Sequence, residues 1–434
     1  MDPADDIRNC QARQRDGRQV TPPECTSGMS HDSAQALQDH IHTKNNQGWR
    51  RIVLNFTPSW FAVTMGTGIA SILLHNLPYN AIWLYWLSVI IFCLNVVLFI
   101  SFFAISVVRY TMFPGIFTAM IQHPAQSLFM GTFPMGLATI INMIVFVCVP
   151  SWGQGAVILA WSLWWIDVAV ALASCFYLPF IIIYVHKSDL STMTAAWLLP
   201  IVATIVAAAS GGIVAEVLPN PQHALWTIIT SYVLWGTGFP MAMIVLTIYF
   251  HRLTVHHLPP REVIVSVFLP LGPLGQGSFA LMQLGKVALR VFPPTNAFQM
   301  EDMGKIFYAV GHLASLIIWG FGLVWFFFAL ASVSRSKFPF NMGWWGFTFP
   351  IGVYAVATCT LAEHLPSAFF RNLGTIFSVA VVLLWAGIAT ETARRAYTGQ
   401  IFFAPCVQGY ERDVAAKMVE KRQGSVTAEN PGSA

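Results

Sequence analysis

Charged residues are scarce in this 434-residue sequence, where Asp, Glu, Lys and Arg make up only 10% and hydrophobic residues 56%. Soluble globular proteins are about 25% charged and about 45–50% apolar, so the chain lacks the polar surface of a water-soluble enzyme, a nucleic-acid binder or a disordered protein. Its net charge of +4 is too small to indicate a polyanionic partner. The composition therefore indicates an integral membrane protein.

Other common signals are missing as well. No apolar segment lies at the N-terminus, so no cleaved signal peptide is expected, and no GxxxxGK[ST] phosphate loop supports an ATP-driven pump. One histidine cluster, His251, His256 and His257, is similar to those of membrane di-iron enzymes, but a single cluster supplies too few ligands. We expect no metal, no cofactor and no enzymatic activity, and a membrane-embedded metalloenzyme is the remote alternative.

Ten apolar runs are long enough to cross a membrane as helices. They cover residues 53–75, 82–108, 127–149, 155–185, 193–217, 224–250, 263–290, 305–333, 343–362 and 372–394. The breaks between them are rich in Pro, Asn and Gly, which are turn residues. The sequence thus predicts an all-α transmembrane domain over residues 51–395. It is flanked by polar tails, residues 1–50 and 396–434, that we expect to be largely disordered.

The distribution of Lys and Arg among the loops predicts the orientation. The loops after the second, fourth, sixth and eighth spans carry Arg109, Lys187, Arg252, Arg261, Arg335 and Lys337. The loops after the first, third and fifth spans carry no Lys or Arg, whereas the later odd-numbered loops carry Arg290, Lys305 and Arg371. Since positive loops stay in the cytosol, both ends of the chain are predicted to be cytosolic, and an even number of spans requires the same.

Each odd-numbered span carries a proline near its cytosolic end: Pro58, Pro134, Pro200, Pro270 and Pro350. The intervals of 76, 66, 70 and 80 residues are each about one helical hairpin. Proline frees a carbonyl group and bends a helix, and such irregular backbone is tolerated where it faces protein or a water-filled path. We interpret the pattern as five hairpins whose odd-numbered helices are kinked and line a pore. The alternative is that proline is simply common in membrane helices.

Four segments carry a resemblance to a known family. They are FTPSWFAVTMGTG from Phe56, GTFPMGLATIIN from Gly131, GPLGQGSFALMQLG from Gly272 and GWWGFTFPIGVYAVAT from Gly343. They resemble the tellurite-resistance/dicarboxylate transporter family, which includes plant slow anion channels, yeast malate permeases and fungal sulfite exporters. The resemblance covers residues from about 50 to 395 and is strongest to the sulfite-exporting members.

This resemblance implies a plasma-membrane anion transporter that forms a homotrimer with a separate pore in each protomer. The odd-numbered helices would lie inside and the even-numbered ones outside. In the channel members a phenylalanine closes the pore; matching the TFP motif places it at Phe349, with Phe61 as a second match. Ala62 follows Phe61 where bacterial and plant members usually have glycine. The implied substrate is sulfite or bisulfite, with malate or chloride and nitrate as alternatives.

Few polar groups could serve such a pore. Hydroxyls on the odd-numbered spans, including Thr64, Thr204 and Thr348, are expected to face it. Lys286 and Arg290 share one helical face near the outer end of the seventh span, where they either attract anions or snorkel to the interface. The scarcity of other cations on these spans favours a small inorganic anion over a dicarboxylate. Membrane lipid is the other expected partner.

Acidic residues inside a membrane are unusual and are often functional. Asp167 in the fourth span and Glu216 near the end of the fifth are the candidates for proton coupling. The fourth span belongs to the outer set, which favours a structural role for Asp167, whereas both roles remain open for Glu216.

Overall fold

The computed structural model describes residues 48–186, 189–295, 297–298, 300–412 and 414–415. The described residues up to 410 form one compact unit, and those from 411 onward belong to a second one. Of this second unit only residues 411, 412, 414 and 415 are described. The predicted disorder of the tails, and Lys187 in the fourth loop, therefore lie outside the described residues.

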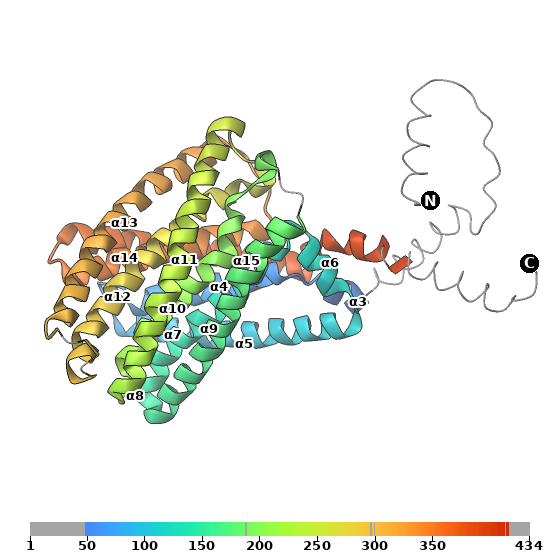
Figure 1. Ribbon diagram of the computed structural model, residues 1–434. Coiled ribbons are helices and arrows are strands. Elements are labelled where there is room, and N and C mark those ends of the chain that lie inside the picture. Colours follow the sequence, from blue (N-terminus) through green and yellow to red (C-terminus); the bar gives the residue numbers. More distant parts are fainter. Residues whose placement is uncertain (1–47, 187–188, 296, 299, 413, 416–434) are drawn as a thin grey trace, which may run out of the picture. The chain divides into compact units, whose positions relative to one another are not determined.

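The described part of the chain is helical and contains no strand (Figure 1). Five helices are designated inner: α4 (Phe61–His75), α7 (Thr132–Met143), α10 (Leu199–Val217), α12 (Leu271–Thr295) and α14 (Trp345–His364). Five are designated outer: α5 (Ile82–Met112), α9 (Gln154–Tyr184), α11 (Pro221–His256), α13 (Met303–Ser334) and α15 (Ala368–Tyr397). The shorter elements include α3 (Gly48–Leu54), α6 (Ile116–Gln122), the π-helical η3 (Ile144–Cys148), α8 (Val149–Trp152) and η4 (Leu190–Thr192).

Nine described helices are long and apolar enough to cross a membrane, or ten if a bent pair counts as one span. The bent pair is Gly48–Leu54 and Pro58–His75, which meet at 81°. Each predicted run corresponds to one of these elements, so the prediction of an all-helical, multi-pass membrane protein is confirmed. The first span differs in detail, because the chain turns sharply before Pro58 and only the part from Pro58 onward continues into α4.

Burial separates the inner from the outer helices. In the most apolar stretch of each span, 78–100% of the residues are buried for the spans that contain α7, α10, α12 and α14, but only 28–39% for the outer helices. In α4, 14 of the 15 residues are buried. A helix that is apolar on all sides is stable in a core or in lipid, so the inner helices form the core and the outer ones present apolar side chains to the membrane.

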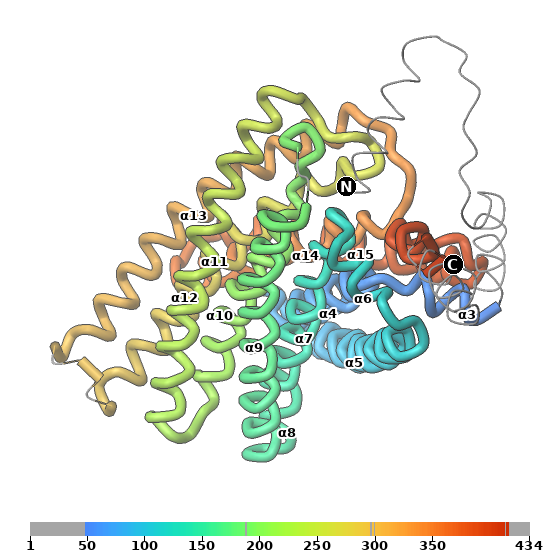
Figure 2. The backbone as a smooth tube through the Cα atoms, turned by 45° about the vertical axis from the view of Figure 1, so that its right-hand side comes forward, coloured from blue at the N-terminus to red at the C-terminus, as the bar shows by residue number. Residues whose placement is uncertain are grey.

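The inner helices form a closed ring. Each packs against the next in the order α4, α7, α10, α12, α14, and α14 packs back against α4. Each outer helix packs on the inner helix of its own hairpin; α11, for example, runs alongside α10 (Figure 2). Close approach within the ring depends on small residues: a Cβ atom on Gly275 of α12 would lie 2.6 Å from the backbone nitrogen of Tyr354 in α14.

Every inner helix is preceded by a 3₁₀ segment. These are η1 (Pro58–Trp60), η2 (Ser127–Gly131), η5 (Ala195–Leu198), η6 (Arg261–Phe268) and η7 (Met342–Trp344). Pro58 begins the first of these segments, and the other four repeat prolines come after theirs. Four of the five lie at or before the first turn of the α-helix: Pro58, Pro134, Pro200 and Pro270. There the missing N–H would be unpaired in any case. These four therefore mark the change from 3₁₀ to α-helix rather than the predicted kink inside a helix. Of the five repeat prolines, Pro350 is the one that lies inside its helix, α14.

Candidate anion pathway

A small apolar cavity lies where the five inner helices meet. It is lined by Met65 of α4, Met135 of α7, Leu198, Leu199 and Val202 around the start of α10, Leu269 and Gly272 at the start of α12, and Phe349 and Pro350 of α14. The space open to the centre of a water molecule is about 10 Å³, which is room for about one water molecule. No polar side chain lines it. The ring thus has a narrow, hydrophobic constriction.

The proline repeat explains much of this lining. Leu199, Leu269 and Phe349 each directly precede a repeat proline, and Met135 directly follows one. These positions lie in the first turns of their helices, which converge on the cavity. The Phe349 side chain is 3% exposed and belongs to the lining. The residue predicted as the gate therefore lies at the constriction, while its gating role stays a prediction.

Phe61, the second predicted gate residue, has a different environment. Its ring packs edge-on against Phe133 of α7 at 5.0 Å and against Phe99 of α5 at 5.5 Å, measured between ring centroids. It is 4% exposed and is not among the residues that line the cavity. Phe133, which precedes Pro134, belongs to the same aromatic cluster rather than to the cavity.

The hydroxyls expected in the pore are bound to the protein. Thr64, Thr204 and Thr348 each donate to the carbonyl oxygen three residues earlier, at 2.8, 2.9 and 2.9 Å. Thr67 and Thr358 also accept hydrogen bonds, from the indole N–H groups of Trp385 and Trp319 on the outer helices. The hydroxyl groups are thus bound within their own helices, two of them also join inner to outer helices, and none of them lines the cavity.

The predicted cations near the outer end are paired with α10. Lys286 Nζ lies 2.8 Å from Glu216 Oε1, and Gln283 Nε2 donates to Glu216 Oε2 at 2.7 Å. Arg290 donates to the carbonyl oxygens of Ala215 (3.3 Å) and Glu216 at the C-terminal end of α10. An ion pair and a capped helix end leave little free charge, so these contacts tie α12 to α10.

A second, polar cavity of about 370 Å³, on the same measure, lies at the C-terminal ends of α4 and α14. Its lining includes His75, Glu363 and Arg371. Arg371, near the start of α15, forms no ion pair with any residue that the structure describes, and Glu363 lies within electrostatic range of Lys286 and Glu216. Arg371 is therefore a positive charge of this cavity without an ion-pair partner among the described residues, and the sequence analysis did not propose it as an anion-attracting residue.

The other flagged residues lie outside the ring. Asp167 is fully buried in the outer helix α9, and neither carboxyl oxygen has a hydrogen-bond partner among the described residues. His251, His256 and His257 lie at the C-terminal end of α11. Within the described part of the chain, no three His, Cys, Asp or Glu side chains are grouped closely enough to hold a metal ion.

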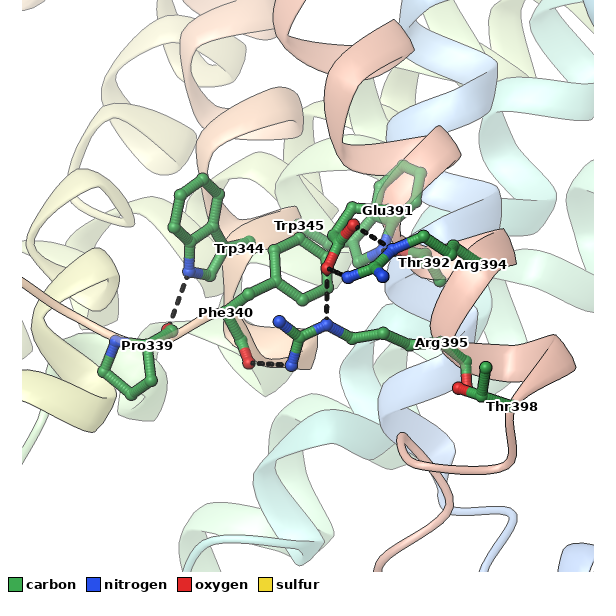
Figure 3. Close-up of polar contacts among 9 residues, drawn as sticks. All are labelled: Pro339, Phe340, Trp344, Trp345, Glu391, Thr392, Arg394, Arg395 and Thr398. Carbon is green, nitrogen blue, oxygen red and sulfur yellow. Dashed lines mark hydrogen bonds and ion pairs between the residues drawn. The ribbon is translucent and has the colours of Figure 1, made fainter.

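The first turn of α14 is held by a polar network that no sequence signal indicated (Figure 3). Trp345 Nε1 donates to Thr392 Oγ1 of α15 at 3.2 Å. One turn further along α15, Arg395 donates to the carbonyl oxygen of Phe340 at 3.3 Å and is bound to Glu391 at 2.6 Å. Because these pairs join residues 47 and 55 positions apart, only the tertiary packing brings them together.

Comparison with known proteins identifies the family. The model of the voltage-dependent anion channel family matches residues 55–393, most of the chain and all ten spans in whole or in part. The chain belongs to this family. The sulfite efflux pump SSU1 of Arthroderma benhamiae is 54% identical over 350 residues, which cover 81% of this chain and 93% of that protein. SSU1 of Candida albicans is 31% identical, with 77% and 73% covered. The malic acid transport protein of Schizosaccharomyces pombe is 25% identical, with 76% of each chain covered.

Proposed function

We propose that this voltage-dependent anion channel family member exports sulfite or bisulfite from the cytosol across the plasma membrane. Both ends of the chain would lie in the cytosol, and the protein would act as a homotrimer with one conduit in each protomer. Support for the substrate comes from the sulfite efflux pumps among its relatives, which it matches over most of their length. The trimer and the membrane are carried over from the resemblance of the sequence to the family.

The observation that carries this proposal is a small apolar cavity whose lining comes from all five inner helices or the segments that lead into them. A conduit through the ring would pass between these helices, and we propose that the cavity beside Phe349 is its constriction. A hydrophobic constriction of this kind excludes water and ions until it widens, which is a known way to gate a channel. We propose that the ring of Phe349 supplies this closure and that Phe61 supports the surrounding helices.

The membrane potential is sufficient to drive export. A cytosol-negative potential moves a monovalent anion outward with about 2.3 kcal/mol per 100 mV. No chemical energy source is then required, and bisulfite can leave passively whenever the constriction opens. A conduit without a buried cation also suits export, because a strong binding site would trap the anion.

The test is transport by the purified protein in liposomes. Sulfite trapped inside should leave when an inside-negative potassium diffusion potential is imposed, and it should leave more slowly when the potential is reversed. Protein-free liposomes and the Phe349→Trp variant, which fills the cavity further, are the controls. Malate flux without sulfite flux would reject the substrate assignment.

Malate is the second candidate, because the Schizosaccharomyces pombe relative carries that name. Longer dianions call for paired cations along the path, but Lys286 is neutralised by Glu216 and Arg290 is bound to helix carbonyls. The structure thus favours a small anion, and chloride or nitrate should be measured beside sulfite in the same liposomes.

Proton coupling is the alternative mechanism, with Glu216 and Asp167 as its candidate residues. Glu216 is held in an ion pair and Asp167 is buried outside the ring, so we propose structural roles for both. Glu216→Gln and Asp167→Asn should leave the response of sulfite flux to a pH gradient unchanged, once flux is normalised to folded protein. If either variant loses the response of sulfite flux to a pH gradient, that residue takes part in proton coupling and the structural role is wrong.

A further inference from the structure

The first turn of α14, which leads to Phe349, makes one helical hydrogen bond fewer to the rest of its own helix than an uninterrupted helix would. Pro350 follows Phe349 directly and has no N–H group, so the carbonyl oxygen of Gly346 loses its helical hydrogen bond. The residues Trp345–Phe349 are therefore joined to the remainder of α14 across a proline break. Contacts with neighbouring elements therefore add to what holds this turn in place.

One support is a hydrogen bond to the last outer helix. Trp345 is fully buried and its Nε1 donates to Thr392 Oγ1 of α15 at 3.2 Å, while its carbonyl oxygen accepts from Thr348 Oγ1 at 2.9 Å. On the opposite side, α4 presents Gly66 to the indole ring: a Cβ atom there would lie 2.6 Å from Cε3 of Trp345. The ring of Trp345 is thus fixed between α4 and α15, four residues before Phe349.

The second support acts on the segment that leads into the turn. Arg395 donates from an η-nitrogen to the carbonyl oxygen of Phe340 at 3.3 Å, and its guanidinium lies 4.9 Å from the centre of the Phe340 ring. Arg395 is itself held by Glu391, at 2.6 Å between Nε and Oε1. Figure 3 shows these side chains reaching from α15 to the segment before α14. Planar contact with a ring and a carbonyl suits arginine and would not be reproduced by lysine.

We propose that Arg395 and the Trp345–Thr392 hydrogen bond are positioning elements for the Phe349 gate. They hold the turn before Pro350 against α15 and so fix where the phenyl ring lies in the constriction. When either contact is lost, the turn can swing about the proline break and the ring leaves the cavity more often. This inference rests on the proposed role of Phe349 as the gate.

The test is a set of double-mutant comparisons of sulfite flux in liposomes. Arg395→Ala removes the contacts with Phe340 and Glu391, and Thr392→Val removes the hydrogen bond from Trp345. Each should raise flux about fivefold, the shift that corresponds to one net hydrogen bond. Neither should change flux when combined with Phe349→Ala, because no ring then remains to be positioned. Arg394→Ala is the matched control: Arg394 also binds Glu391, but none of its hydrogen bonds or ion pairs with the described residues reaches Phe340, so flux should stay within about twofold of wild type.

The outcomes separate this inference from the proposed function. If Phe349→Ala alone leaves flux unchanged, the gate assignment fails and the positioning role fails with it. If Phe349→Ala raises flux but Arg395→Ala and Thr392→Val act equally with and without the ring, the contacts serve only general stability and this inference is wrong. Thermal unfolding of each variant identifies misfolding, and Thr392→Val, which preserves side-chain shape, keeps the test decisive if Arg395→Ala does not fold.

Discussion

Phe61 and Phe349 have similar neighbours in the sequence, but their side chains lie in different surroundings in the structure. Both lie within three residues of a repeat proline and both are almost fully buried. Pro58 precedes Phe61, so α4 begins cleanly at Phe61 and the ring packs among aromatic residues of α5 and α7. Pro350 follows Phe349, so that ring lies before a break in α14 and borders the cavity. The two rings thus differ in what surrounds them, and the order of phenylalanine and proline does not decide this alone, because Phe133 precedes Pro134 and still packs beside Phe61.

The largest difference between the two phenylalanines is expected when each ring is removed in turn. Phe349→Ala should increase anion flux at least about tenfold, equivalent to about 1.4 kcal/mol of barrier, because the constriction widens. Phe61→Ala should not open the path; it should instead lower the free energy of unfolding by about 3–5 kcal/mol, as expected when a buried aromatic ring is lost. Flux per folded molecule and thermal unfolding measure the two effects. Equal gains in flux from both variants would refute the distinction.

A smaller effect is expected at the contact between the two helices that carry these rings. Gly66→Ala places a methyl group against Trp345, so the free energy of unfolding should fall by about 1–3 kcal/mol through overpacking. Gly346→Ala is the control on the other helix, since its nearest neighbour would be 3.6 Å away and the methyl group is accommodated. Chemical or thermal unfolding compares the pair. Equal stability of the two variants would show that α4 does not press on the first turn of α14.

The smallest effects are expected at the outer end, beyond both rings. Lys286→Gln breaks a partly exposed ion pair, which should cost about 0–1 kcal/mol of stability and leave flux nearly unchanged. Arg371→Gln removes the unpaired cation of the outer cavity and should reduce flux about twofold at low salt, with the difference vanishing at high salt. Sulfite flux measured across a range of ionic strengths checks both. A larger loss from Lys286→Gln would restore that residue as the anion-attracting group.

Much of the fold could be predicted from hydrophobic runs, because a helix needs about 20 apolar residues to cross a membrane and unpaired backbone groups or charges within that length are costly. The resemblance to the family also indicated Phe349, which lines the cavity, whereas Leu199 and Leu269, which precede repeat prolines in the same way, were not predicted there. The pairing of Lys286 with Glu216 and the contacts of Trp345 and Arg395 could not be predicted, since each joins residues far apart in sequence. The sequence shows that Lys286 and Arg290 share a face, but not that α10 ends opposite them.

The 3₁₀ segments before the inner helices were also missed, for a related reason. Proline is compatible both with a bend inside a helix and with a helix start, and hydropathy does not distinguish the two. The structure assigns four of the five repeat prolines to helix starts. The remaining one, Pro350, is the one beside the proposed gate.

The ring is closed by contact between its first and last members, α4 and α14. A nascent chain therefore encloses nothing until the final hairpin has left the ribosome, and that hairpin brings Phe349 with it. Under the proposed role of Phe349, the step that completes the ring of helices also brings the gate residue into place. A chain truncated before residue 345 would lack α14 and Phe349, so its remaining inner helices could not close the ring.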